Sequence, residues 1–364
     1  MKNPETSTAS SWHWDNMDPL WWAVVFWMDC VGWGQAPPVL LGPGHFGRAQ
    51  RRLCGQLLDF TANHGRDRRI WSAALCQRRD LYVYLPPGYD PSKKYPLAIY
   101  LHGAAQDENF FLQAQVDRLD QAIASGQLPP IIIAAPDGSL RGRATIYKPA
   151  TFFANSRAGQ FEDYVMQDVW DFLHANFSIR PDRDGHALIG VSMGGSAAYT
   201  LAIKHRERIK AVMGIHPPLN LRWADSRGRY RVPFDPDDWG TRESLRGWEA
   251  LGRRRFFTLR FHDLFGPTFG HGRQAMARIS AINPLEMLDT HDVRPGEFDF
   301  FVAYGGRDEF NITAQVDSFL WRARERGLEV GVAFDPHGRH DLATGLRLWP
   351  ETLRWAAQHT PATP

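Results

Sequence analysis

Short apolar runs alternate with helix-like segments from residue 81 onward, and this alternation constrains the fold most strongly. The runs have the length and composition of strands buried in a parallel sheet. Strands that alternate with helices form a mainly parallel sheet with helices on both faces. We therefore predict an α/β domain over residues 81–364. Its strands are expected at Leu81–Leu85, Leu97–Leu101, Ile131–Ala135, Ala187–Val191, Ile209–Ile215, Phe298–Tyr304 and Val330–Phe334, and its helices at Glu162–Phe177, Ser192–His205 and Leu346–Gln358.

Composition and charge exclude several classes of protein. Of 364 residues, 43% are hydrophobic and 23% charged, as in a globular chain with a sizeable core. A formal net charge of +2 argues against a dedicated nucleic-acid binder. The apolar run Leu20–Met28 is too short to span a bilayer, which takes about 20 residues, and no basic region precedes it. We expect a cytoplasmic protein without a membrane span; secretion would require a signal peptide outside the given sequence.

Residues 1–80 have no clean strand or helix period, and we predict an N-terminal extension that lies against the main domain. Six of the fourteen tryptophans of the chain lie in the first part of this extension, from Trp12 to Trp33. Packing is the simpler interpretation of these tryptophans, and a carbohydrate-stacking surface is the alternative. Three cysteines, Cys30, Cys54 and Cys76, are too few for a disulfide framework, so free thiols are expected.

The motif Gly-x-Ser-x-Gly occupies residues 190–194, directly after a predicted strand and before a predicted helix. This context is typical of a nucleophile elbow, a turn so tight that a side chain at Gly190 or Gly194 would collide with its neighbours. The turn projects the hydroxyl of Ser192 above the sheet, and the N–H groups of the helix start favour developing negative charge. The motif therefore predicts Ser192 as a nucleophile.

A nucleophilic serine needs a base and an orienting acid, which follow it in the chain order serine, acid, histidine. Asp308 comes directly after the strand Phe298–Tyr304 and is the favoured acid, with Glu309 as the competitor. His337 and His340 both follow the last strand and are both candidates for the base. His340 lies further along the loop, which favours it only slightly.

An oxyanion hole needs two N–H donors. We expect one from Met193, the residue after the nucleophile, and the other from Ala104, in the loop after the strand Leu97–Leu101. Gly103 precedes Ala104 and would allow the backbone to approach the substrate closely.

The chain from about residue 80 to 345 resembles the putative-esterase family of α/β-hydrolases, which groups feruloyl, acetylxylan and siderophore esterases. The resemblance is carried by residues 81–103, the helix start at 161–164, residues 190–209, and the ending Gly338-Arg339-His340-Asp341. That ending matches the family's Gly-x-His-Asp and favours His340 over His337. The resemblance implies an α/β-hydrolase fold. Residues 1–80 and 217–283 have no counterpart in it.

Residues 217–283, here called the cap segment, are too long for a plain loop between two strands. They follow the carboxyl end of a strand, so we expect them to hang over the site. The segment holds twelve arginines, no lysine and seven acidic residues, interleaved with aromatic residues. A solvated surface is the simpler interpretation. The alternative is recognition of an aromatic or acidic ester by Arg222, Trp223 and Arg231.

Two other patterns carry no comparable signal. Gly-x-Gly-x-x-Gly at 42–47 begins no strand–helix–strand unit, and His337-x-x-His340 lacks further metal ligands. We therefore expect no cofactor and no metal. The sequence predicts a serine esterase acting on a small-molecule or carbohydrate ester, such as one of feruloyl or acetyl-sugar type, and leaves its oligomeric state open. The alternatives are an acyltransferase that uses the same residues, a peptidase with this fold, and a non-catalytic binding protein with this fold.

Overall fold

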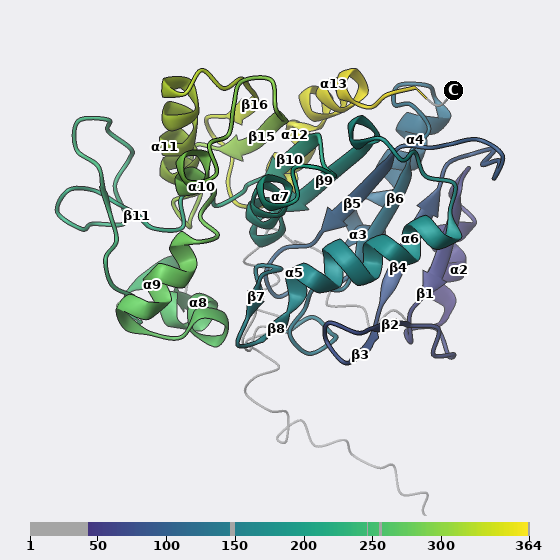
Figure 1. Cartoon of the computed structure of the whole chain (residues 1–364), viewed down its shortest axis with the longest axis horizontal. Coiled ribbons are helices and arrows are strands. Elements are labelled where there is room, and N and C mark those ends of the chain that lie inside the picture. Colours follow the sequence, from purple (N-terminus) through teal and green to yellow (C-terminus); the bar gives the residue numbers. More distant parts are fainter. Residues whose placement is uncertain (1–42, 146–149, 246, 255–256, 363–364) are drawn as a thin grey trace, which may run out of the picture.

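The computed structural model in Figure 1 describes residues 43–145, 150–245, 247–254 and 257–362. The predictions for the six N-terminal tryptophans and for Cys30 lie outside these residues. Cys54 and Cys76 are exposed free thiols. Among the described residues, no helix has the length and apolar character needed to cross a membrane.

An eight-stranded sheet forms the centre of the molecule, in the order β1-β4-β6-β5-β9-β10-β15-β16 (Figure 1). The strand β4 runs antiparallel to both of its neighbours, and the strands from β6 to β16 are parallel. This arrangement confirms the predicted mainly parallel sheet. The bounds are β1 Gln56–Phe60, β4 Leu81–Leu85, β5 Leu97–Leu101, β6 Ile132–Pro136, β9 His186–Val191, β10 Ala211–Ile215, β15 Asp299–Gly305 and β16 Val330–Asp335.

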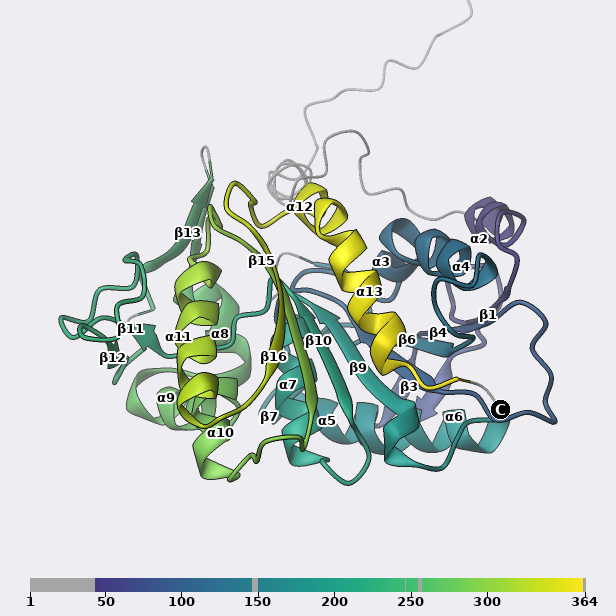
Figure 2. The same cartoon turned by 90° about the horizontal axis from the view of Figure 1, so that it is seen from above.

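Helices cover both faces of this sheet, as the alternation predicted. One face packs against α5 (Phe161–Asp163), the π-helical turn Tyr164–Val169 with α6 (Trp170–Asn176), α7 (Met193–Lys204), α10 (Pro284–Thr290) and α11 (Ile312–Glu325). The other face packs against α2 (Pro43–Gln50), α3 (Asn109–Ala114), α4 (Val116–Ala124) and α13 (Trp349–His359), with α12 (Leu342–Arg347) at the end of the sheet. Figure 2 is seen from the side of α13.

The sheet begins before residue 81. The strand β1 is its edge strand and pairs with β4, Gln56 opposite Leu85. A short hairpin of β2 (Ile70–Ser72) and β3 (Gln77–Arg79) connects the two. The sequence of β1 does not look like a buried strand, because it contains the charged residue Asp59. In the structure Asp59 is buried, and its carboxylate binds Thr61 and Arg68. The division at residue 81 therefore does not coincide with the edge of the sheet, and as a domain boundary it stays a prediction.

The cap segment folds between β10 and β15 as short hairpins followed by helices. Its elements are β11 (Trp223–Ala224), β12 (Gly240–Thr241), β13 (Ala250–Arg254), β14 (Phe257–Arg260), α8 (Phe261–Phe269) and α9 (Gly272–Ser280). Its large aromatic side chains are mostly internal: Trp223, Tyr230, Phe261, Phe265 and Phe269 are all buried. The segment lies beside α11 at one end of the sheet (Figure 1).

Candidate active site

Ser192 stands in the turn between β9 and α7 with a strained backbone. Its φ of 52° and ψ of −118° lie in a region that side chains rarely occupy, and such strain is typical of functional sites. The flanking glycines are required by contact: a Cβ at Gly190 would lie 2.1 Å from the carbonyl oxygen of Gly194, and one at Gly194 would lie 2.1 Å from that of Leu101. The turn therefore has the crowding that the motif predicted.

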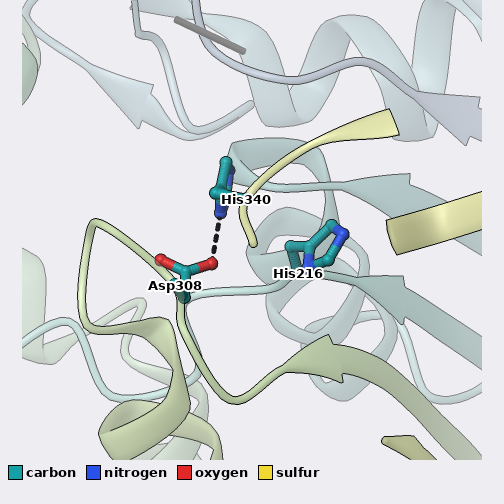
Figure 3. Close-up of side chains that lie close together, drawn as sticks. All are labelled: His216, Asp308 and His340. Atoms are coloured by element: carbon teal, nitrogen blue, oxygen red, sulfur yellow. Dashed lines mark hydrogen bonds and ion pairs between the residues drawn. The ribbon is translucent and has the colours of Figure 1, made fainter. Parts of the chain in front are cut away.

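Ser192, His340 and Asp308 form a continuous hydrogen-bonded series. The Oγ of Ser192 lies 3.0 Å from Nε2 of His340, and Nδ1 of His340 lies 2.7 Å from Oδ2 of Asp308. Figure 3 shows the second of these bonds. Asp308 follows β15 and His340 follows β16, so the parallel strands bring all three residues to the same edge of the sheet.

The two competing residues occupy different places. Glu309 does not reach the imidazole; its Oε2 accepts the backbone N–H of His340 at 3.1 Å and so holds that residue's main chain. His337 is exposed to solvent in the turn after β16. The structure thus brings Asp308 and His340 to Ser192 and leaves the two alternatives outside the series.

Charge and burial act in opposite directions on the pKa of His340. Burial alone would lower it, but the charge and hydrogen bond of Asp308 raise it above its ordinary value, with Glu309 and Asp341 adding to the effect. Burial would likewise raise the pKa of Asp308, but the nearby charge of His340 and their hydrogen bond keep it below its ordinary value. The pair therefore stabilises a protonated imidazole beside an ionised carboxylate.

His216 is a third ionisable group at this site, which the sequence analysis missed. It follows β10, and its ring centre lies 5.2 Å from that of His340 (Figure 3). Burial, with the charge of His340, lowers the pKa of His216 to about 4, so the ring is neutral at ordinary pH. Its position directly after a parallel strand is the signal that could have identified it, since Asp308 and His340 were found by the same rule.

The N–H groups expected to form the oxyanion hole belong to residues that line the pocket beside Ser192. Met193 begins α7 and Ala104 follows β5, and both contribute to the pocket wall. Neither N–H has a hydrogen-bond partner within the described parts of the chain. The loop that carries Ala104 is fixed by Gln106, whose Oε1 accepts the N–H of Gly103 at 2.8 Å. Both donors are thus available to a ligand.

The pocket above Ser192 has a volume of about 110 Å³ and mainly apolar walls. Besides Ser192 and His340, these walls come from α3, from the loop after β15, from α12 and α13, and from the cap segment. The cap segment contributes Leu221, Tyr230, Leu251, Leu259, Phe261, Leu264 and Phe265. The cap therefore borders the site, as its place after β10 predicted.

The residues predicted to recognise substrate do not line this pocket. Arg222 forms an ion pair with Glu286 at 3.0 Å, and Arg231 donates to the backbone oxygens of Leu251 and Glu309. Trp223 is completely buried in the cap, with its indole N–H bound to the backbone oxygen of Tyr230. These contacts hold all three side chains within the protein itself. The pocket beside Ser192 therefore gives no support to the alternative that they recognise substrate, which stays a prediction.

Within the described ranges, two groups of side chains bring potential metal ligands within 4.8 Å of one another: His216, Asp308 and His340, and a second group of Asp80, Glu108 and Asp137. In the first group, the hydrogen bond between Asp308 and His340 already uses the facing atoms. In the second group, the guanidinium of Arg79 lies 2.9 Å from Asp137 and supplies the positive charge.

Known proteins resemble this chain in sequence. The model of a family described as putative esterases matches residues 72–261, more than half of the chain. An esterase of Mycobacterium tuberculosis is 27% identical over 301 residues, which cover 79% of this chain and 58% of the relative. The endo-1,4-beta-xylanase Y of Acetivibrio thermocellus is 28% identical over 247 residues, which cover 62% of this chain and 20% of the relative. The chain thus spans little more than half the length of the first of these relatives.

Solved structures share the fold at low sequence identity. A ferulic acid esterase superposes with a TM-score of 0.62 at 16% identity, covering 85% of this chain and all of its own. An S-formylglutathione hydrolase from Agrobacterium tumefaciens superposes with a TM-score of 0.59 at 17% identity, covering 85% of this chain and 97% of its own. The predicted α/β-hydrolase fold is confirmed.

Proposed function

Because the chain belongs to the putative esterase family, we propose that it hydrolyses carboxylic esters through an acyl-enzyme formed on Ser192. The observation that carries the proposal is the hydrogen-bonded series from Ser192 through His340 to Asp308, at 3.0 and 2.7 Å. The series ends in a buried carboxylate and begins at a hydroxyl that faces an apolar pocket.

In the first half of the reaction, Oγ of Ser192 attacks the ester carbonyl carbon while Nε2 of His340 takes its proton. Asp308 accepts the Nδ1–H, which fixes the tautomer that leaves Nε2 free to accept. The N–H groups of Met193 and Ala104 stabilise the tetrahedral oxyanion. The C–O bond to the alcohol then breaks, and the alcohol leaves with the proton from Nε2. In the second half, water attacks the acyl-enzyme by the same steps and releases the acid and Ser192.

The substrate's acyl group faces apolar side chains. The name of one structural neighbour, a ferulic acid esterase, points to a feruloyl ester, and that of one relative, a xylanase, points to a carbohydrate. A feruloyl-sugar and an acetyl-sugar ester therefore belong in the panel of test substrates. The pocket walls next to Ser192 include Phe152, Phe265 and Phe310, which suit the ring of a feruloyl group.

An ester panel tests this proposal. Wild-type protein should cleave p-nitrophenyl acetate, a feruloyl sugar and an acetylated sugar at rates that Ser192→Ala abolishes. Excess acceptor alcohol separates hydrolysis from acyl transfer: hydrolysis predicts free acid as the main product, whereas transfer would give a new ester. A folded wild-type protein that cleaves no ester would support the non-catalytic alternative.

A further inference from the structure

The central strand β9 is incompletely covered on one face. It is fifth of the eight strands, and a strand at that place in a parallel sheet is ordinarily buried on both faces. Leu188 points to the α7 face and is fully buried, whereas Ala187, Ile189 and Val191 are half-buried on the opposite face. On that face α4 and α13 are separate helices (Figure 2). This half-buried row of side chains indicates that the two helices leave an opening above β9.

A second cavity of about 60 Å³ occupies this opening. Its floor consists of side chains from β5, β6, β9 and β10. Its walls come from α4, the segment after α4, and α13. It shares four lining residues with the pocket above Ser192: Gln115, Ile215, Trp349 and Thr352. The two cavities therefore adjoin, and together they follow β9 from the nucleophile back into the sheet.

The chemistry of the second cavity is almost purely apolar. Among the described residues no Asp, Glu, Lys or Arg lines it. Its polar side chains include Gln115 and Thr352 at the junction, and His359 and Thr360 at the far end of α13. An apolar channel without charged groups favours a hydrocarbon ligand and cannot compensate a buried charge.

The two adjoining cavities are here together called the channel. The strand β9 beneath them gives the length of this channel. From Val191 to Ala187 the strand advances four residues, or roughly 13 Å at about 3.3 Å per residue. An extended alkyl chain with carbon–carbon bonds of about 1.5 Å covers that distance with roughly ten methylenes. A feruloyl ring would fill the pocket next to Ser192, but an alkyl chain can also continue between the two helices.

We propose that this channel binds the acyl chain of the substrate ester. That chain has about eight to twelve carbons, so the preferred substrate is a medium-chain acyl ester. The inference rests on the proposed esterase function and names its substrate class. The carbonyl of the ester lies at Ser192, and the chain passes Ile215 and Thr352 to reach the floor formed by Ile189 and Ala187. Each methylene that leaves water contributes about a fourfold gain in binding.

Chain-length kinetics provide the first test. For wild-type protein, kcat/KM on p-nitrophenyl esters should rise from acetate to decanoate. Ala356→Phe fills the channel from α13, and Ala187→Leu fills it from β9. Either variant should lower the ratio of kcat/KM for decanoate to that for acetate by about tenfold or more. The matched control is Gln358→Phe, which adds the same side chain to an exposed position of α13 and should leave the ratio unchanged.

Binding without catalysis provides the second test and separates the two proposals. Calorimetric titration of decanoate into Ser192→Ala should show binding that Ala356→Phe removes and Gln358→Phe retains. If decanoate binds in this way but no ester is cleaved, the proposed function fails and the channel stands. If acetate or a feruloyl ester is cleaved best and decanoate does not bind, the channel proposal is overturned while the esterase function stands.

Discussion

Two groups of ionisable side chains are buried near the carboxyl edge of the sheet, and they differ in what they can reach. One group, here called the His340 group, consists of His216, Asp308 and His340. It borders a pocket, and His340 contacts the hydroxyl of Ser192. The other group, here called the Arg79 group, consists of Asp80, Glu108 and Asp137 together with Arg79. These side chains are buried, and Asp137 pairs with Arg79. Both groups contain side chains with shifted pKa values.

The difference between the two groups teaches that a perturbed pKa is not in itself a sign of catalysis. Burial raises the pKa of Asp80 to about 6, with the charge of Asp137 acting in the same direction. Burial also raises the pKa of Glu108 well above its ordinary value. Burial is the first cause of these shifts, as it is of the lowered pKa of His216 beside Ser192. A cavity and an aligned nucleophile distinguish the His340 group, so substitutions there should change activity, whereas substitutions around Arg79 should change stability.

Removal of the nucleophile or the base should have the largest effect. Ser192→Ala and His340→Ala should each lower kcat on p-nitrophenyl acetate by about 10⁵–10⁶, as expected for groups that act as a unit. Both should melt close to the wild-type temperature. His337→Ala is the matched control, because that histidine is exposed in the same loop. Near-wild-type activity of either triad variant would refute the assignment.

Asp308→Asn should lower kcat by about 10⁴, because an amide favours the wrong imidazole tautomer. Glu309→Gln keeps an oxygen that can accept the N–H of His340 and should have a mild effect. The comparison is made by steady-state kinetics on one ester. A severe Glu309→Gln beside a mild Asp308→Asn would exchange the roles of the two carboxylates.

The pH profile should report the His340 group and not the Arg79 group. Neutral imidazole is the base, so kcat/KM should rise with pH through a pKa above about 6.5, the ordinary value for histidine. In Asp308→Asn the residual activity should follow a lower pKa, since the charge that raises it is gone. An unchanged profile would show that Asp308 does not act on His340.

Arg79→Met should lower the free energy of unfolding by about 3–5 kcal/mol, because it leaves Asp137 buried without its partner. The folded fraction should retain wild-type kcat/KM. Arg52→Met is the control: its pair with Asp117 is exposed, and its loss should cost less than about 1 kcal/mol. Urea denaturation measures both, and a catalytic defect in folded Arg79→Met would erase the distinction between the two groups.

The smallest expected effect concerns Asp80. Its folded pKa of about 6 lies above the ordinary 3.8, so its contribution to stability is complete below about pH 4 and is lost as pH rises through 6. Ionisation therefore costs roughly 3 kcal/mol by pH 7. Asp80→Asn should show a smaller loss of stability between pH 4 and 7 than wild type. Equal losses in the two proteins would place the pH dependence elsewhere.

Local signals in the sequence predicted much of the fold and the centre of the site. The strands β4 and β5 lie where their apolar runs placed them, and the elbow turn at Ser192 has its predicted crowding. Interactions between distant segments were not predictable. The expected final helix is two helices that meet at Leu348, just before Pro350 in the first turn of α13. No local pattern shows that Arg222 pairs with Glu286, because the two residues are 64 positions apart in the chain.

Covalent labelling of the nucleophile tests the central claim most directly. Wild-type protein treated with a fluorophosphonate should carry one adduct, which mass spectrometry of the peptide spanning residues 187–204 assigns to Ser192. The same peptide contains Ser196, a buried serine in α7 that serves as an internal control. His340→Ala should label far more slowly. No adduct on folded wild-type protein, or an adduct on Ser196 or another serine, would contradict the account.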